Sequence, residues 1–293
     1  MKTTNIPYPI GFLMMLLPLF SACEKVIELD LDTQAKELVI DAAIDWEKGT
    51  SGAVQTIQLS YTQPYYSQEA PEGASGATIM VGDDQGNLFP FTETQPGTYQ
   101  NSDFTPALGR RYGLIIGHQG KEYVATDILK EVPELTQANI TQTNDGGFTR
   151  DQIMLTLRFD VPAGEDNNFV LRIKASSDGV TRLYGFNDRY FPDGHFTTQI
   201  LSRSNKKEEQ FKAGDTVELT LFRVSETYMN YIRVLSNNAT NNAGLLSIPN
   251  RAKGNIFYRA NPKENPLGAF RVAQYSKVIY VIRPREALGL PKP

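Results

Sequence analysis

The stretch "QIMLTLRFDV", residues 152–161, decides the fold class because apolar and polar side chains alternate along most of its length. In an extended strand, Ile153, Leu155, Leu157, Phe159 and Val161 all face one side. A period of two over ten residues predicts a β-strand with one buried face. The same rule predicts strands at "NFVLRIKA" (168–175) and "DTVELTLFRV" (215–224). The more uniformly apolar "SKVIYVIR" (276–283) is typical of a central strand.

Shorter alternating segments fill the first half of the chain. "ELVIDAAI" (37–44) and "VQTIQLSY" (54–61) each predict one strand. "ATIMVG" and "NLFPFTE" flank the turn-forming "DDQG", and "RYGLIIG" and "KEYVATDI" flank "HQG", so each pair predicts a hairpin. About six short strands at this spacing indicate a β-sandwich over residues 37–130.

A charged segment separates the two halves. "KEVPELTQ", residues 130–137, contains Pro133, which interrupts strand pairing, and it therefore predicts a linker. We expect two tandem β-sandwich-like domains, at residues 37–130 and 137–283, that fold separately. Residues 284–293 end in Pro-Lys-Pro and predict a loose tail.

One amphipathic helix is predicted in the second domain, near residues 226–238. Ser225 is a suitable N-cap. Tyr228, Tyr231, Ile232 and Leu235 follow the spacing of one helical face. We expect this face to pack on the second sheet, since an exposed apolar stripe lowers solubility.

The single cysteine, Cys23, lies where an apolar run ends and acidic residues begin. A charged start, an apolar core and small residues before position 23 predict a signal peptide over residues 1–22. Cys23 directly follows Ser21-Ala22, an arrangement that resembles the bacterial lipobox, although Phe20 stands where an aliphatic residue is usual. Cys23 is the predicted lipidation site, and residues 23–36 form an acidic tether. Two or more acyl chains anchor a protein firmly, so we expect attachment to the membrane through the lipid.

Several function classes find no support in the sequence. The net charge is −4 and no basic stretch is present, so nucleic acid is not an expected partner. The two histidines, His118 and His195, have no neighbouring ligands at metal-binding spacing. No nucleophile elbow or phosphate-binding glycine loop occurs. We therefore predict no catalytic residues, no metal and no cofactor.

Two aromatic segments are the candidate binding features. "YGFNDRYFPDGHF" (184–196) contains Tyr190, Phe191 and Phe196, and "YTQPYYSQEAPEG" (61–73) contains Tyr65 and Tyr66. Aromatic side chains on loops are enriched at binding surfaces. We predict these five residues as partner contacts, with internal packing as the alternative for each loop.

Three groups of residues together resemble a known family. "ACEKVIELDLD" before "ELVIDAAI", the loop "NDRYFPDG", and the closing segments "IPNRAKGNI" and "NPLGAFRV" occur in the order typical of the domain of unknown function forty-two forty-nine family. Its members are lipoproteins of Bacteroidota, and the resemblance covers nearly the whole chain after Cys23. It implies an outer-membrane lipoprotein associated with a TonB-dependent receptor and an immunoglobulin-like first domain. Ala269 departs from the aromatic that is commoner between the glycine and the phenylalanine.

We therefore expect a lipid-anchored, non-enzymatic accessory or ligand-capture subunit of a TonB-dependent transporter in the outer membrane. Its ligand is unknown, and the periplasmic and cell-surface faces both stay open. The alternatives are a lipid-anchored hydrolase acting on peptide or glycan, and an envelope structural protein.

Overall fold

A computed structural model describes residues 35–64, 67, 69–147, 152–161, 166–191, 193–202, 210–240 and 251–288. Residues Lys36–Pro293 belong to one unit, to which all the described strands belong. Cys23 and the predicted signal peptide and tail end (289–293) lie outside the described residues, as do Tyr65 and Tyr66.

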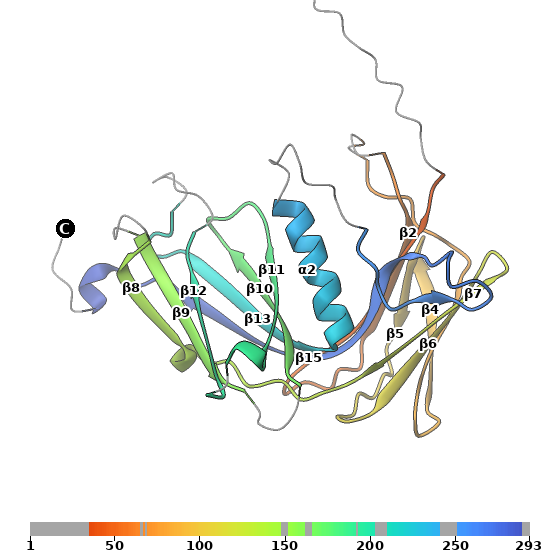
Figure 1. Ribbon diagram of the computed structural model, residues 1–293, viewed down its shortest axis with the longest axis horizontal. Helices are drawn as coiled ribbons and strands as arrows, with labels where there is room; N and C mark the ends of the chain where they lie inside the picture. The colour runs from red at the N-terminus through yellow and green to blue at the C-terminus, as the bar shows by residue number, and fades with distance from the viewer. Residues whose placement is uncertain are drawn as a thin grey trace, which may run out of the picture. The chain divides into compact units, whose positions relative to one another are not determined.

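The chain is mainly β with one α-helix longer than a single turn in the described part, which confirms the predicted fold class (Figure 1). The first half forms β1 (Leu38–Glu47), β2 (Gln55–Tyr61), β3 (Thr78–Asp83), β4 (Leu88–Gln95), β5 (Thr98–Asn101), β6 (Arg111–His118) and β7 (Lys121–Ile128). The second half forms β8 (Ile140–Gly146), β9 (Gln152–Asp160), β10 (Asn168–Ala175), β11 (Arg182–Asn187), β12 (His195–Ile200), β13 (Thr216–Val224), α2 (Glu226–Thr240), β14 (Phe257–Tyr258) and β15 (Leu267–Val281). Three short 3-10 turns are η2 (Gln137–Asn139), η3 (Asp188–Tyr190) and η5 (Arg285–Leu288).

Twelve strands form one ladder in the order β11-β10-β13-β15-β1-β2-β5-β4-β3-β6-β7-β14, and β12-β9-β8 form a separate sheet. The two predicted hairpins are present, since β3 pairs with β4 and β6 pairs with β7, both antiparallel. Gln119 and Gly120 both have positive φ in the β6–β7 turn, the backbone that a two-residue hairpin loop requires.

The described residues form two main apolar clusters. The first buries the inward residues of β1 to β7, and the second buries those of β8 to β13 with the end of β15. Within β9, Leu155, Leu157 and Phe159 are fully or almost fully buried, as the alternation predicts. The sheets thus cover both clusters in a sandwich-like arrangement.

The closing segment of the chain returns to the first cluster. β15 pairs in parallel with β1 over residues 267–275 and antiparallel with β13 over residues 275–281. A Cβ on Gly268, which has φ of +96°, would lie 2.0 Å from the Ile40 oxygen, so only glycine permits this approach. Beside it, the Asn255 side chain donates to the Phe270 oxygen and accepts from the Phe270 amide, at 2.9 and 2.8 Å. Part of the segment that the sequence assigns to the second domain therefore packs with the first.

The predicted linker also differs from the structure. Val132 and Leu135 are buried in the second cluster. Their amides donate to the side chains of Gln274 and Ser276, at 3.1 and 2.8 Å. Because its apolar side chains are buried and its amides bond to side chains of β15, this segment lies on β15 as part of the fold.

The predicted helix is confirmed at Glu226–Thr240. The Ser225 oxygen accepts from the Met229 amide at 3.0 Å, which begins the helix. Tyr228, Met229 and Ile232 are buried against the sheet with Val170 and Ala273. The helix passes over β15 and β10 (Figure 1), and it contacts β11, β10 and β15.

Candidate binding groove

The candidate site lies at the end of the ladder formed by β11. This strand pairs only with β10 among the described strands, so its other edge is open. Just beyond the strand, the Asp188 amide donates to the Asn167 oxygen, so the backbone groups of Asp188 point toward the β10 side. Backbone groups alternate in direction along a strand, so the even-numbered residues of β11 also point toward β10. Leu183 and Gly185 therefore direct their backbone groups to the open edge.

A close approach between α2 and β11 forms one wall of the site. A Cβ on Gly185 would lie 2.8 Å from the Met229 oxygen and 2.9 Å from the Arg233 Cγ, so this position requires glycine. The Ser236 hydroxyl donates to the Leu183 oxygen at 2.9 Å. This bond occupies one carbonyl of the open edge and holds the C-terminal half of α2 to the strand.

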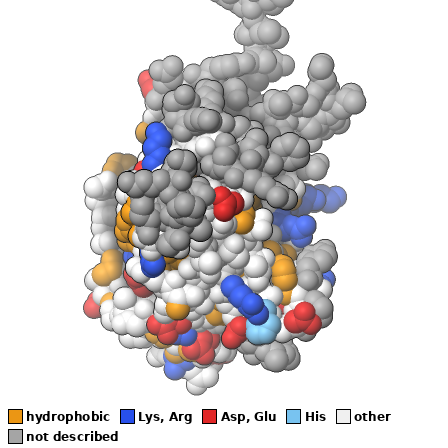
Figure 2. Space-filling view, turned by 90° about the vertical axis from the view of Figure 1, so that its left-hand side faces the viewer, with side chains coloured by type: hydrophobic (Ala, Val, Ile, Leu, Met, Phe, Trp, Pro, Cys, Tyr) orange, Lys and Arg blue, Asp and Glu red, His pale blue; other side chains and the backbone are white. Residues whose placement is uncertain are grey.

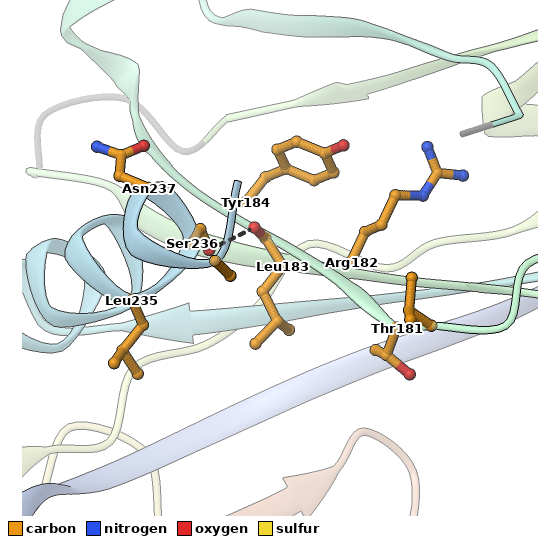
Figure 3. A pocket seen from close by; sticks show the side chains of 9 residues that line it. Thr181, Arg182, Leu183, Tyr184, Leu235, Ser236 and Asn237 are labelled. Atoms are coloured by element: carbon orange, nitrogen blue, oxygen red, sulfur yellow. Dashed lines mark hydrogen bonds between the residues drawn. The ribbon is translucent and has the colours of Figure 1, made fainter. Parts of the chain in front are cut away.

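A groove of about 570 Å³ follows this junction. Figure 3 shows Tyr184 on one side of β11 and Leu183, with Leu235 of α2, on the other. Val180, Tyr184 and Leu235 have exposed fractions of 45%, 49% and 39%. The groove is lined by Val180, Thr181, Arg182, Leu183, Tyr184, Leu235, Ser236, Asn237 and Ala239. Its volume lies within the roughly 300–1,000 Å³ typical of ligand pockets, and its lining combines apolar and aromatic side chains with four polar ones.

The one charged residue among these lining residues is already neutralised. A guanidinium nitrogen of Arg182 lies 2.9 Å from the Asp178 carboxylate, and another donates to the Leu201 oxygen at 2.8 Å. The Arg182 side chain is mostly buried. The groove therefore offers apolar and aromatic contact area, and charge recognition is not its main chemistry.

A buried ion pair fixes the N-terminal half of α2. Arg271 of β15 donates from Nε to Asp45 Oδ1 at 2.8 Å and from a second nitrogen to Oδ2 at 2.5 Å. A third nitrogen bonds the Tyr228 hydroxyl, and the guanidinium carbon lies 5.1 Å from the Tyr228 ring centre and 5.4 Å from that of Phe222. Burial opposes the charge of Arg271, but Asp45 raises its pKa well above the usual value. The pair joins β1, β15 and α2.

A buried carboxylate connects β7 to the same helix. Asp127 accepts hydrogen bonds from the amides of Val272 and Ile128 and from the Ser225 side chain. Burial raises the pKa of Asp127 to about 6, and these hydrogen bonds offset only part of that effect. Both halves of the chain therefore position α2, and through it the groove.

A second, smaller hollow of about 320 Å³ lies on the outer face of β3 and β6, beside Leu88 and Ile115. Both side chains are exposed, but Asp83, Asp84 and Arg111 also border the hollow. It offers less volume and more charge than the groove at β11.

The predicted aromatic contacts have different positions. Phe196 is only 5% exposed, and its ring lies 4.0 Å from that of Phe186 and 4.9 Å from that of Phe159. Phe191 is partly buried and meets Phe196 edge-on at 5.0 Å. The expectation that Phe196 contacts a partner does not fit this placement, because its ring packs between the two sheets. Tyr190 belongs to η3, and its side chain lies outside the described residues, as do Tyr65 and Tyr66.

The remaining polar features do not assemble a reaction centre in the described residues. His195 Nδ1 lies 2.7 Å from Asp160 Oδ1 at an exposed strand end. No group of three His, Cys, Asp or Glu side chains in this part of the chain could hold a metal ion. None of its helices is long and apolar enough to cross a membrane. Among the described side chains that Figure 2 colours, basic and acidic ones are interspersed.

The groove residues were only partly visible in the sequence. Tyr184 begins the aromatic segment, and Leu235 ends the apolar stripe of the helix. The close contact between β11 and α2 depends on Gly185, which is not part of any apolar alternation. A single glycine inside a strand often marks a close backbone approach, so Gly185 was the one local sequence feature that pointed to this contact.

Comparisons with solved structures return proteins of low similarity to this chain. A two fibronectin type-III domain segment from chicken tenascin is 10% identical, with 57% of this chain and 83% of that chain covered and a TM-score of 0.21. The adhesin InvE of Yersinia pseudotuberculosis is 14% identical, with 64% and 54% covered and a TM-score of 0.21. The FN1-FN3 domains of chicken CNTN1 are 12% identical, with 63% and 62% covered and a TM-score of 0.23. TM-scores this low support no inference about function.

No curated protein matches the chain. A family model matches residues 24–278, which include every described strand except the last three residues of β15. The chain therefore belongs to the family described as Domain of unknown function (DUF4249).

Proposed function

We propose that this protein is a lipid-anchored, non-enzymatic accessory or ligand-capture subunit of a TonB-dependent transporter in the outer membrane. The observation that carries the proposal is the open apolar groove between β11 and α2. Exposed Val180, Tyr184 and Leu235 all line this groove, and a buried network positions the helix that forms its wall. An exposed cluster of this kind is typical of a binding surface.

The membrane part of the proposal rests on the sequence. Cys23 follows a short apolar run and small residues, the arrangement of a lipoprotein signal. An anchored protein is confined beside its membrane neighbours. Even a modest affinity for a receptor is then amplified by effective concentration.

The main rival is a lipid-anchored hydrolase. A hydrolase needs a nucleophile within hydrogen-bond reach of a base, and His195 with Asp160 is the nearest such base pair in the described residues. In this part of the chain, no serine or threonine hydroxyl bonds His195. The groove and this pair also belong to different elements, so no single observation favours the rival.

The test is co-purification from native membranes of the producing organism. We expect the full chain to retain a TonB-dependent receptor, identified by mass spectrometry. The variant Tyr184→Ala/Leu235→Ala should retain at least about tenfold less, because each side chain supplies aromatic or aliphatic contact area that can contribute about 1–2 kcal/mol.

The matched control is Leu88→Ala/Ile115→Ala, which removes two exposed side chains from the opposite half of the chain. This variant should retain the receptor as the wild type does, and both variants should keep the wild-type melting temperature. Equal receptor recovery by the groove variant and the wild type would refute the role of the groove. Recovery of no receptor by the wild type would refute the proposed function.

A further inference from the structure

The outer face of strands β4, β3, β6, β7 and β14 carries a continuous row of apolar side chains. Residues directly opposite one another in neighbouring antiparallel strands share a face of the sheet. The pairing therefore aligns one outward residue from each strand, in the order Pro90, Met80, Ile115, Val124 and Phe257. Ile115 and Phe257 are 48% and 47% exposed, so the row faces away from the first cluster. A contiguous exposed apolar surface of this kind is typical of an interaction site.

The adjacent row of the same face contains a hollow with a bare floor. Gly82 of β3 lies directly opposite Gly113 of β6, and Leu88 and Thr126 flank this pair on β4 and β7. The hollow has a volume of about 320 Å³. Leu88 is 66% exposed beside it. The face therefore has one projecting apolar side chain and one recess next to each other.

The described chain gives no reason for glycine at position 113. Glycine weakens the interior of a strand because it has no side chain to pack. Gly113 does not have positive φ, and a Cβ there would meet no described atom within 4 Å. The recess over Gly113 is thus open, whereas a Cβ on Gly82 would lie 3.1 Å from Leu88 Cδ2. A glycine of this kind often marks the close approach of another molecule.

We propose that this face is the interface of a symmetric dimer, in which Leu88 of each copy fills the recess over Gly113 of the other. A two-fold interface brings the same face of both copies together, so each projecting group needs its matching recess on that one face. Leu88 and the recess meet this requirement. Asp84 and Arg111 border the same hollow, so the face also offers one charge of each sign to a second copy. The inference does not rest on the groove or on the proposed function.

The size of the face suits a reversible dimer. Strands β3, β4, β6 and β7 are six to eight residues long. With strands about 4.8 Å apart and a rise of about 3.4 Å per residue, they present about 500 Å². Two copies together would bury roughly 1,000 Å², which is the lower limit of a biological interface. Association at this limit is weak, so it should depend on protein concentration.

Sedimentation equilibrium of the full chain in density-matched detergent tests the dimer. We expect the average protein mass to rise from that of one copy toward that of two between about 1 μM and about 1 mM, the range of weak association. The measurement uses no receptor, so its result is independent of the test of the proposed function.

Gly113→Val separates the interface from the stability of the fold. Valine favours strands and the position is open, so this variant should melt at the wild-type temperature or above it. Melting temperatures are compared at about 1 μM, where the dimer is dissociated. The valine fills the recess, so the dissociation constant of the dimer should rise at least about tenfold. Leu88→Ala removes the projecting group and should weaken the dimer to a similar degree.

The double variant Leu88→Ala/Gly113→Val tests the contact directly. Within one chain, Leu88 does not reach the Gly113 position, since a Cβ there meets no described atom within 4 Å. Across the dimer, the new valine occupies space that the missing leucine leaves. The double variant should therefore dimerise more tightly than either single variant.

The matched control is Ile279→Ala/Val281→Ala. It removes two apolar side chains that are 49% and 51% exposed on β15, outside this face, and it should dimerise as the wild type does. Leu88→Ala/Ile115→Ala should lose the dimer yet still retain the receptor, because the groove lies on β11 and α2.

A wild-type chain that stays monomeric up to about 1 mM would overturn the proposal, whatever else covers the face. A double variant whose weakening equals the sum of the two single effects would also overturn it. If Gly113→Val does not fold, the comparison of the wild type with Leu88→Ala decides. Equal dissociation constants for these two chains would show that Leu88 is not in the interface.

Discussion

The Asp45–Arg271 pair should be one of the strongest single polar contributions to the stability of this fold. We would replace Asp45 by Asn and Arg271 by Met, singly and together. Asp45→Asn keeps the side-chain shape and removes the charge, and Arg271→Met keeps an apolar stem for packing. The two residues lie on β1 and β15, which meet only in the folded chain.

The expected magnitude follows from the geometry of the pair. The two bonds between the side chains are 2.8 and 2.5 Å long, and the side chains are 18% and 27% exposed. Removing one member of a buried pair costs roughly 3–5 kcal/mol, because the other charge stays buried without its partner. Since neither side chain here is fully buried, we expect each single change to cost about 3 kcal/mol. The double variant should cost about 2 kcal/mol less than the sum of the two single variants.

Urea unfolding followed by circular dichroism measures the four free energies of unfolding in this cycle. The matched control is the exposed pair Lys121–Glu264, whose atoms are 3.4 Å apart and whose side chains are 44% and 56% exposed. Its coupling should stay within about 0.2–1 kcal/mol. If the Asp45 and Arg271 changes add to within about 0.5 kcal/mol, the two residues do not act as a buried pair and the reasoning fails.

Further changes test other parts of the description. Cys23→Ala should abolish palmitate labelling and leave the protein released or as its precursor, whereas persistent labelling would contradict lipidation at this residue. The carboxyl pKa of Asp127 moves from 3.8 to about 6 on folding, so the wild type loses stability as the pH rises from 4 to 7.5. Asp127→Asn cannot titrate and should therefore gain up to about 3 kcal/mol relative to the wild type over this range. A difference in the free energy of unfolding in urea that does not change with pH would exclude this. Phe196→Ala should lower the free energy of unfolding by roughly 3–5 kcal/mol, and a calorimetric melting temperature equal to that of the wild type would instead indicate an exposed ring. A fragment of residues 137–283 should be less soluble and unfold less cooperatively than the full chain, because its segment 267–275 has lost its pairing partner β1. A sharp calorimetric transition of the fragment would instead support two independent domains.

Local patterns were enough to predict most strands. The alternation in β9 placed Leu155, Leu157 and Phe159 inward, and all three are buried. The helix prediction was equally direct, since its apolar spacing and the N-cap at Ser225 are contained in one short segment. The segments 98–101, 140–146, 182–187 and 195–200 also form strands, but they carry too little alternation to be predicted. Such strands form because their neighbours supply the hydrogen-bond partners.

The site was harder to predict than the strands. The aromatic segment 184–196 was identified as a unit, yet it divides between two environments. Tyr184 is exposed in the groove, whereas Phe196 packs against Phe186 between the sheets. Alternation along one strand assigns two opposite faces, but it does not say which face another sheet or a helix will cover.

The amino-acid sequence by itself determined the β class, the single amphipathic helix, the turn positions and the family, because each depends on short-range periodicity or on local motifs. Only the tertiary structure decided that β15 lies beside β1 and that residues 130–137 pack on β15. Backbone hydrogen bonds between strands are the same for any sequence. Which strand pairs with which is therefore set by the arrangement that buries both apolar clusters at once. The groove has the same origin, since Leu183 and Ser236 are 53 positions apart and meet only when α2 covers the end of the sheet.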